Sequence, residues 1–203
     1  MELMGAELKE HNMRTTIPHP SGIGIVCTIM DAVHMLKLVR NTFAAKGVLY
    51  DDKNREIKFE YLVALDKYQE QKGIHLGNKL RKSHIHFSKN KMKSKLAIQL
   101  FSNSVADAIE YLLENNVEEF RGSRATIEFI RTMNNLFDIM NSKSKYGLDF
   151  RRPYCNSTHD EFSQYLRYCQ KNITQLTLNQ HGTKKFLLDS ANFTGFLGLL
   201  VNI

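Results

Sequence analysis

Cysteine, proline and tryptophan are scarce in this sequence: its 203 residues include three cysteines, three prolines and no tryptophan. Three cysteines are too few for a disulfide framework, so a reducing compartment is expected. No apolar run approaches the roughly 20 residues that a membrane-spanning helix needs, and the first residues lack the charged and apolar regions of a secretory signal. With 42% hydrophobic and 24% charged residues, the composition is globular and excludes disordered, collagen-like and coiled-coil chains.

Acidic residues are absent from residues 71–106, although the whole chain has 21 of them. That stretch contains a basic segment, Lys72–Lys95, whose cations are Lys72, Lys79, Arg81, Lys82, Lys89, Lys91, Lys93 and Lys95. The rest of the chain is almost neutral, so the net charge of +7 belongs to the basic segment. A concentrated positive field attracts the phosphates of DNA, RNA or nucleotides and acidic lipid headgroups. The alternative is a solvated, lysine-rich surface loop.

Hydrophobic periodicity predicts a mainly helical chain. Helices are expected over residues 2–11, from Asp31 to Gly47, and over about 56–71, 92–113, 123–141 and 159–178, with strands over 24–30 and near 185–188. The apolar run 24–30 is typical of a strand buried on both faces, and Ser123 is a suitable N-cap for the clearest helix. The pattern also predicts an interruption near Ser102 or Ser104, a polar turn over 50–57 and a linker over 143–153.

Asp31 directly follows the expected strand and precedes the next helix. A carboxylate at the carboxyl end of a buried strand is a common position for a Mg²⁺ ligand, because Mg²⁺ prefers hard oxygen ligands. The alternative is that Asp31 only caps the helix by accepting hydrogen bonds from its first N–H groups. Taken alone, the pattern favours the cap.

Familiar nucleotide, metal and nucleophile motifs are missing. Nothing matches the P-loop pattern G-x-x-x-x-G-K-[ST], and Gly22-Ile23-Gly24 precedes its strand and lacks the third glycine of a dinucleotide fingerprint. The cysteines form no closely spaced pair for zinc, and no Ser/His/Asp or Cys/His nucleophile is indicated. A nucleotide would therefore have to bind in another geometry.

Asp138 is an unusual residue in the clearest helix, because it lies between Phe137 and Ile139 in a stretch suited to burial. A carboxylate can accept hydrogen bonds from both the ring N–H and the exocyclic amine of guanine, and adenine cannot supply that pair of donors. Phe137 could offer a stacking face. The alternative, which periodicity alone favours, is a polar stripe of Asn134, Asp138 and Asn141 that faces water.

Several motifs, in order along the chain, resemble P-element-type transposases and their vertebrate THAP-domain relatives. They are MDAVHMLKLVRN at 30–41, GNKL at 77–80, KMK at 91–93, AIQLFSNSVADA at 97–108, ATIEFI at 125–130, NNLFDIMNS at 134–142 and FTGFLG at 193–198. The resemblance extends from about Pro18 to the end of the sequence. Several colinear motifs of this length are much more specific than any one of them.

The resemblance implies a mainly α fold, in which a helical GTP-binding insertion domain is flanked by incomplete RNase H-like α/β segments. It implies an RNase H-like part over residues 1–41, the insertion over 42–150, and the insertion end with a returning RNase H-like part over 151–203. Asp31 would be a catalytic carboxylate that holds Mg²⁺. Phe137, Asp138 and Asn141 would hold the guanine of GTP, Lys79 would contact the phosphates, and either Ser102 or Ser104 could also touch the nucleotide.

The family's catalytic centre uses three carboxylates, and only Asp31 has a match here. The other two are expected before Met1 and after Ile203, and the family's zinc-dependent DNA-binding module has no match either. A fragment or domesticated derivative is therefore expected, nuclear by resemblance, without DNA cleavage of its own and with no membrane partner. Its expected partners are GTP, the DNA of transposon ends and a second copy of itself. The alternative is a non-enzymatic, transposase-derived host protein that binds DNA through Lys72–Lys95, and a third possibility is a decayed remnant without selected function.

Overall fold

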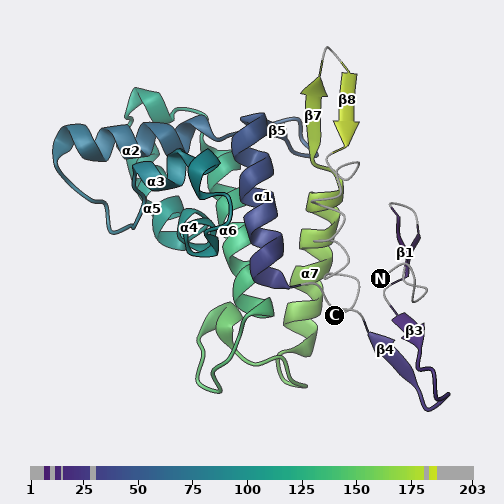
Figure 1. Ribbon diagram of the computed structural model, residues 1–203. Coiled ribbons are helices and arrows are strands. Elements are labelled where there is room, and N and C mark those ends of the chain that lie inside the picture. The colour runs from purple at the N-terminus through teal and green to yellow at the C-terminus, as the bar shows by residue number, and fades with distance from the viewer. Residues whose placement is uncertain (1–6, 10–11, 15, 28–30, 181–182, 187–203) are drawn as a thin grey trace.

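The computed structural model describes residues 7–9, 12–14, 16–27, 31–180 and 183–186, and in them the chain is mainly helical, as predicted (Figure 1). The helices are α1 Ala32–Lys46, α2 Glu60–Lys72, α3 Lys82–Ile85, α4 Ser94–Leu100, α5 Asn103–Glu114, α6 Arg124–Met140 and α7 His159–Thr174. Short 3-10 helices are η2 Phe87–Asn90, η3 Glu118–Phe120 and η4 Asp149–Arg151. The strands are β1 Glu7–Lys9, β2 Asn12–Arg14, β3 Thr16–Pro18, β4 Ile25–Cys27, β5 Val48–Tyr50, β6 Glu56–Lys58, β7 Thr177–Gln180 and β8 Thr183–Phe186.

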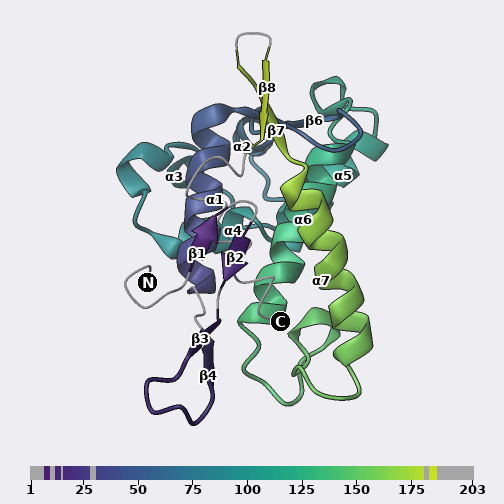
Figure 2. The same cartoon turned by 90° about the vertical axis from the view of Figure 1, so that its right-hand side faces the viewer.

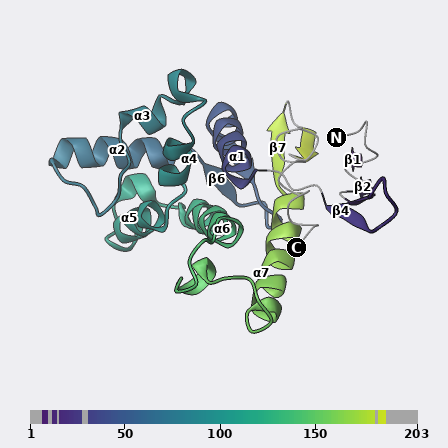
Figure 3. The same ribbon diagram turned by 60° about the horizontal axis from the view of Figure 1, so that its bottom comes forward.

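Helix α6 lies in the middle of the helical body, with α1, α5 and α7 around it (Figure 3). Its apolar stripe is broad enough to pack on all three neighbours, because residues at helical spacing on several flanks are buried. Phe129 of α6 meets Phe43 of α1 edge to face, with ring centroids 5.3 Å apart, and Phe101 at the end of α4 at 5.9 Å. This aromatic cluster fixes the relative positions of α1, α4 and α6.

A four-stranded antiparallel sheet lies beside the helices, with strand order β6-β5-β7-β8. Tyr50 of β5 pairs with Glu56 of β6 on one side and with Thr177 of β7 on the other. The sheet therefore joins the start of the helical body to the strand that follows α7. Two separate hairpins, β1–β2 and β3–β4, precede α1.

Most of the predicted helices are confirmed. Gly47 ends α1 at a φ of 77°, where a residue without a side chain is favoured. The expected interruption separates α4 from α5, and Ser102 occupies the N-cap position of α5. Ser123 lies at the N-cap of α6, but its hydroxyl is buried without a hydrogen-bond partner in the described part of the chain, so its expected side-chain cap is wrong.

Other predictions are wrong because strand pairing overrides local pattern. Residues 7–9 form β1, paired with β2, where a helix over 2–11 was expected. The polar turn expected over 50–57 is present at residues 51–55, but its two ends pair as β5 and β6, so α2 begins at Glu60 and not near 56. Likewise α7 ends at Thr174, because the residues after it enter β7.

The strand predicted over 24–30 is present as β4, Ile25–Cys27, and residues 28–30 lie outside the described residues. Its burial on both faces is wrong, since Ile25 is 73% exposed. The reason is that β4 pairs only with β3 in the described part of the chain. The strand expected near 185–188 overlaps β8, while residues 187–203, with the motif at 193–198, lie outside the described residues. No helix among the described residues is long and apolar enough to cross a membrane.

Candidate functional site

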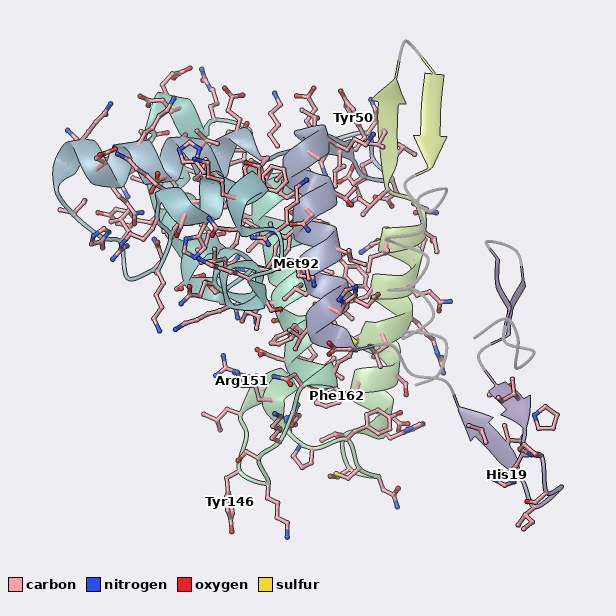
Figure 4. All side chains as sticks on the ribbon, in the orientation of Figure 1. His19, Tyr50, Met92, Tyr146, Arg151 and Phe162 are labelled. Atoms are coloured by element: carbon pink, nitrogen blue, oxygen red, sulfur yellow. The ribbon has the colours of Figure 1, made fainter. Side chains whose placement is uncertain are left out.

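Asp138 lies in the last turn of α6 and is held by two side chains. Its Oδ2 accepts hydrogen bonds from Asn134 Nδ2 at 2.9 Å and from Arg151 Nε at 3.2 Å. The side chain of Asp138 is 18% exposed, and that of Arg151 is 68% exposed. Asn134 is one helical turn before Asp138, whereas Arg151 reaches it from η4, next to the end of α6 (Figure 4). The stripe that sequence alone placed in water is therefore partly covered at Asp138.

Residues 142–151, which we call the strap, form the first part of the connection between α6 and α7. Ser142 Oγ donates to the Arg151 carbonyl at 2.5 Å, which ties the two ends of the strap together. Phe150 stacks on Tyr165 of α7 with ring centroids 4.3 Å apart. Tyr165 Oη accepts a hydrogen bond from Asn135 Nδ2 at 3.1 Å, and burial raises the pKa of Tyr165. The strap thus packs against both α6 and α7.

Phe137, Asp138 and Asn141 come together at the C-terminal end of α6, as adjacent residues of one helix end must. Phe137 is buried, at 7% exposed, and packs in the apolar core. Asn141 is exposed, and its backbone N–H donates to the Phe137 carbonyl at 2.9 Å. A helix C-terminus carries partial negative charge from its free carbonyls. This end of α6 therefore suits the N–H donors of a base better than it suits a phosphate.

Lys79 lies in the connection between α2 and α3, and its side chain is exposed. The residue before it, Asn78, is buried and donates to Gln69 Oε1 at 2.8 Å, which anchors this connection to α2. Figures 1 and 3 show α2 and α3 apart from the C-terminal end of α6. Ser102 and Ser104 share a hydrogen bond of 3.0 Å at the α4–α5 junction.

Asp31 caps α1. Its Oδ1 accepts from the Val33 N–H at 3.1 Å and its Oδ2 from the His34 N–H at 3.3 Å, and the side chain is exposed. Each oxygen keeps a lone pair, so the carboxylate is also suited to be one ligand of Mg²⁺. The described residues contain no group of three metal-ligating side chains.

Helices α1 and α6 run in opposite directions. The start of α1 and the end of α6 therefore lie at the same end of the helical body (Figure 2). Asp31 and Asp138, the two carboxylates singled out by the sequence, belong to these two helix ends.

The basic segment forms an exposed positive surface. All eight of its cations are exposed. Lys82 Nζ pairs with Glu70 at 2.5 Å, and this contact raises the pKa of Lys82. Arg81 contacts His75 Nδ1 at 3.1 Å, and Met92, 78% exposed, marks the turn between η2 and α4 (Figure 4).

Arg40 of α1 supports this surface from inside. It is fully buried, and its Nη2 donates to the carbonyls of Asn90 and Lys91, each at 3.2 Å. Its Nε donates to Asn41 at 2.7 Å, while Nη1 finds no partner among the described residues. Burial lowers the pKa of Arg40. The turn of residues 90–93 is thereby fixed to α1 by a cation that itself makes no ion pair with a described carboxylate.

Two hollows lie elsewhere on the molecule. One, of about 410 Å³, lies between α2 and η3, and its lining includes Tyr61, Tyr68 and Arg121. The other, of about 210 Å³, lies between the β5–β6 hairpin, α6 and α7. Neither is lined by the residues that the sequence singled out.

Sequence reasoning missed Arg40 and Arg151 as parts of these surfaces. Arg40 is 50 residues from the carbonyl groups it holds, and Arg151 is 13 residues from Asp138 across a connection without regular periodicity. Asn134 was visible as a polar residue four positions before Asp138, a spacing that brings side chains together on a helix.

Comparisons with known proteins agree with this architecture. A family model described as the TNP-like, GTP-binding insertion domain matches residues 33–153. The chain is 29% identical over 201 residues to the DNA transposase THAP9 of Homo sapiens, which covers 98% of this chain and 22% of that protein. It is 33% identical over 149 residues to the transposable element P transposase of Drosophila melanogaster, covering 68% of this chain and 18% of that protein.

Among solved structures, the Drosophila P element transposase strand transfer complex is similar in fold. The TM-score is 0.77 and the identity 23%, over 92% of this chain and 41% of that one. The chain thus spans about a fifth of the length of the curated relatives it matches.

Proposed function

This chain belongs to the TNP-like, GTP-binding insertion domain family of P-element-type transposases, and from that premise we propose that it binds a guanine nucleotide at the C-terminal end of α6. The observation that carries the proposal is the Asp138 carboxylate, which is only 18% exposed and has no hydrogen bond on Oδ1 from the described residues. A half-buried carboxylate with an open oxygen is suited to the two adjacent N–H donors of guanine.

Asn141 is the second proposed contact, because it is exposed one turn after Phe137 at the same helix end. Phe137 is the proposed stacking residue; since its ring is packed in the core, only an edge of it could meet a base. The lack of a P-loop is compatible with GTP acting as a cofactor that positions DNA and not as fuel.

Lys79 is the proposed phosphate contact, and either Ser102 or Ser104 is a further candidate. Because Lys79 would meet the phosphates and not the base, its variant is expected to weaken GTP binding without changing the preference for guanine over adenine. Asp31 would hold a catalytic Mg²⁺ when the other carboxylates of the family are present, and the metal would then polarise phosphate oxygens of DNA. The proposed setting is DNA transposition in the nucleus.

Titration of the purified chain with GTP and ATP tests the guanine site. Asp138→Ala removes two hydrogen bonds, so GTP binding is expected to weaken by about 10- to 100-fold. Asp138→Asn offers one acceptor and one donor, which complement the ring N–H and the carbonyl of xanthine. This variant should therefore exchange GTP for xanthosine triphosphate.

Asp160→Asn is the charge-matched control, since Asp160 is an exposed aspartate in the first turn of α7. It should leave GTP affinity unchanged. Equal binding of GTP and ATP by the unmodified chain, or an Asp138→Ala variant that binds GTP normally, would refute the guanine site.

A second candidate function is DNA binding through the basic segment, and the exposure of all eight cations favours it. Each neutralised DNA phosphate contributes about −0.9 to the slope of log affinity against log salt. Replacing Lys89, Lys91 and Lys93 with glutamine should make that slope shallower by up to about 2.7. Fluorescence anisotropy with duplex DNA over a range of NaCl concentrations measures it.

The matched control replaces Lys53, Lys143 and Lys145 with glutamine, because all three are exposed lysines outside the basic segment. These control substitutions should leave the slope of log DNA affinity against log salt unchanged. A slope that falls equally in both sets of variants would mean that general charge, and not this surface, binds the DNA.

A further inference from the structure

The hydrogen bonds on Asp138 are unevenly shared between its oxygens. Oδ2 accepts from both Asn134 Nδ2 and Arg151 Nε, whereas Oδ1 accepts nothing from the described residues. A carboxylate oxygen has two lone pairs, so these two donors already fill Oδ2. A guanine edge that uses both oxygens must therefore displace one of the two donors.

Arg151 is the donor that can leave more easily. Its contact is the longer one, 3.2 Å against 2.9 Å, and its side chain is 68% exposed. Asn134 is fixed on the same helix one turn away. An ion pair with one partner so exposed to water contributes little stability, so a ligand that brings two N–H donors can replace it.

The strap is folded in a way that presents Arg151 to Asp138. Besides the Ser142 hydrogen bond to the Arg151 carbonyl, Gly147 packs directly on the same carbonyl group. A Cβ atom at position 147 would lie 2.0 Å from the Arg151 carbonyl oxygen and 2.5 Å from its carbon. Since backbone cannot yield as a side-chain tip can, any residue other than glycine at position 147 must move the strap.

We propose that Arg151 is an internal competitor for the guanine edge: it occupies Asp138 in the free protein, and guanine binding displaces it together with the strap. This rests on the proposed guanine site and adds its regulation. Free and bound states then differ in whether Oδ2 of Asp138 faces Arg151 or the base. The apparent affinity for guanine is lowered by the fraction of molecules in which Arg151 is seated.

The size of the effect follows from the exposure of the pair. Exposed pairs contribute at most about 1 kcal/mol, which corresponds to a change of about fivefold in a binding constant. Arg151→Gln is therefore expected to bind guanosine two- to fivefold more tightly than the unmodified chain. Guanosine is the appropriate probe because it has no phosphate, so the loss of a positive charge does not change its long-range attraction to the protein.

Arg152→Gln is the matched control. Arg152 is the next residue of the chain, but its Nη2 donates to both carboxylate oxygens of Glu161 at 2.7 Å, and its guanidinium lies 5.5 Å from the Phe162 ring centroid. It should leave guanosine affinity unchanged. Gly147→Ala, which moves the strap without removing a charge, should tighten guanosine binding in the same direction as Arg151→Gln.

The salt dependence of guanosine binding distinguishes competition by Arg151 from a purely structural role of this residue. Screening weakens exposed ion pairs, so guanosine binding by the unmodified chain should tighten as NaCl is raised from about 0.05 to 0.5 M, while Arg151→Gln should show no change. Isothermal titration calorimetry of the unmodified chain and of its Arg151→Gln, Arg152→Gln, Gly147→Ala and Asp138→Ala variants measures both effects.

The outcomes separate this inference from the proposed function. If Asp138→Ala abolishes guanosine binding, Arg151→Gln and Gly147→Ala tighten it and Arg152→Gln leaves it unchanged, the inference is supported. If Arg151→Gln binds guanosine equally or more weakly, or if Arg152→Gln tightens binding as much, the inference is overturned and the guanine site stands. If Asp138→Ala binds guanosine like the unmodified chain, the proposed function itself fails.

Discussion

The C-terminal end of α6 and the basic segment differ in how far their charged side chains are buried and paired. At α6, the one carboxylate is half buried and already paired with Asn134 and Arg151. In the basic segment, all eight cations are exposed, and Glu70 pairs with one of them. A surface of open cations attracts any phosphate and depends on salt. A carboxylate that must exchange one partner for another selects its ligand by the geometry of the donors.

The support beneath the two regions also differs. Asp138 is fixed by residues of its own helix and a nearby connection, within 13 residues. The turn of residues 90–93, which we call the lysine turn, is fixed by Arg40, which is 50 residues earlier in the chain than Asn90. The proposed guanine contact is thus supported by nearby residues, whereas the positive surface is supported by a residue distant in the sequence.

The largest expected effect comes from removing that support. Arg40→Ala deletes three hydrogen bonds from a buried cation and leaves a cavity, so the free energy of unfolding should fall by about 3 kcal/mol. Arg40→Met fills the volume and removes a buried charge that lacks a described carboxylate partner, so its cost should be only about 1 kcal/mol. Urea denaturation followed by circular dichroism measures both.

Arg81→Ala is the control for Arg40, because Arg81 is an exposed arginine of the basic segment. Its cost should stay within about 0.5 kcal/mol. An Arg40→Ala variant as stable as Arg81→Ala would show that the lysine turn holds its place without Arg40, and the contrast between local and distant support would disappear.

The smallest expected effect tests the pair within the basic segment. Glu70→Gln releases Lys82 and removes a negative charge from the edge of the positive surface. DNA affinity at low salt should rise by about twofold, because both partners are more than half exposed and their pair is weak. The increase should vanish in about 0.5 M NaCl.

Glu114→Gln is the matched control for Glu70, as an exposed glutamate at the end of α5. If the two variants change DNA affinity equally, the increase reflects net charge alone. An increase confined to Glu70→Gln extends the comparison: in both regions, an internal pair then withholds one charge from an incoming ligand.

Sequence periodicity identified the helices well and their ends less well. The α6 pattern predicted 123–141 against an observed Arg124–Met140, because its apolar stripe is long and uninterrupted. The predictions failed where short strands form, at β1 and at β6, because pairing between segments gives free energy that no local pattern contains. Ser123 has the right position but makes no side-chain cap, since its hydroxyl is enclosed by the fold.

For the candidate site too, some features follow from the sequence and others only from the tertiary structure. The sequence by itself determined that the chain is mainly helical, that its excess of positive charge belongs to Lys72–Lys95, and that Asp138 lies near the end of the clearest helix, between Phe137 and Asn141. These are properties of neighbouring residues. Only the tertiary structure decided that Arg151 reaches Asp138 and that Arg40 is buried beneath the lysine turn. Such contacts depend on how helices pack around the core, and packing joins residues whose separation along the chain carries no signal.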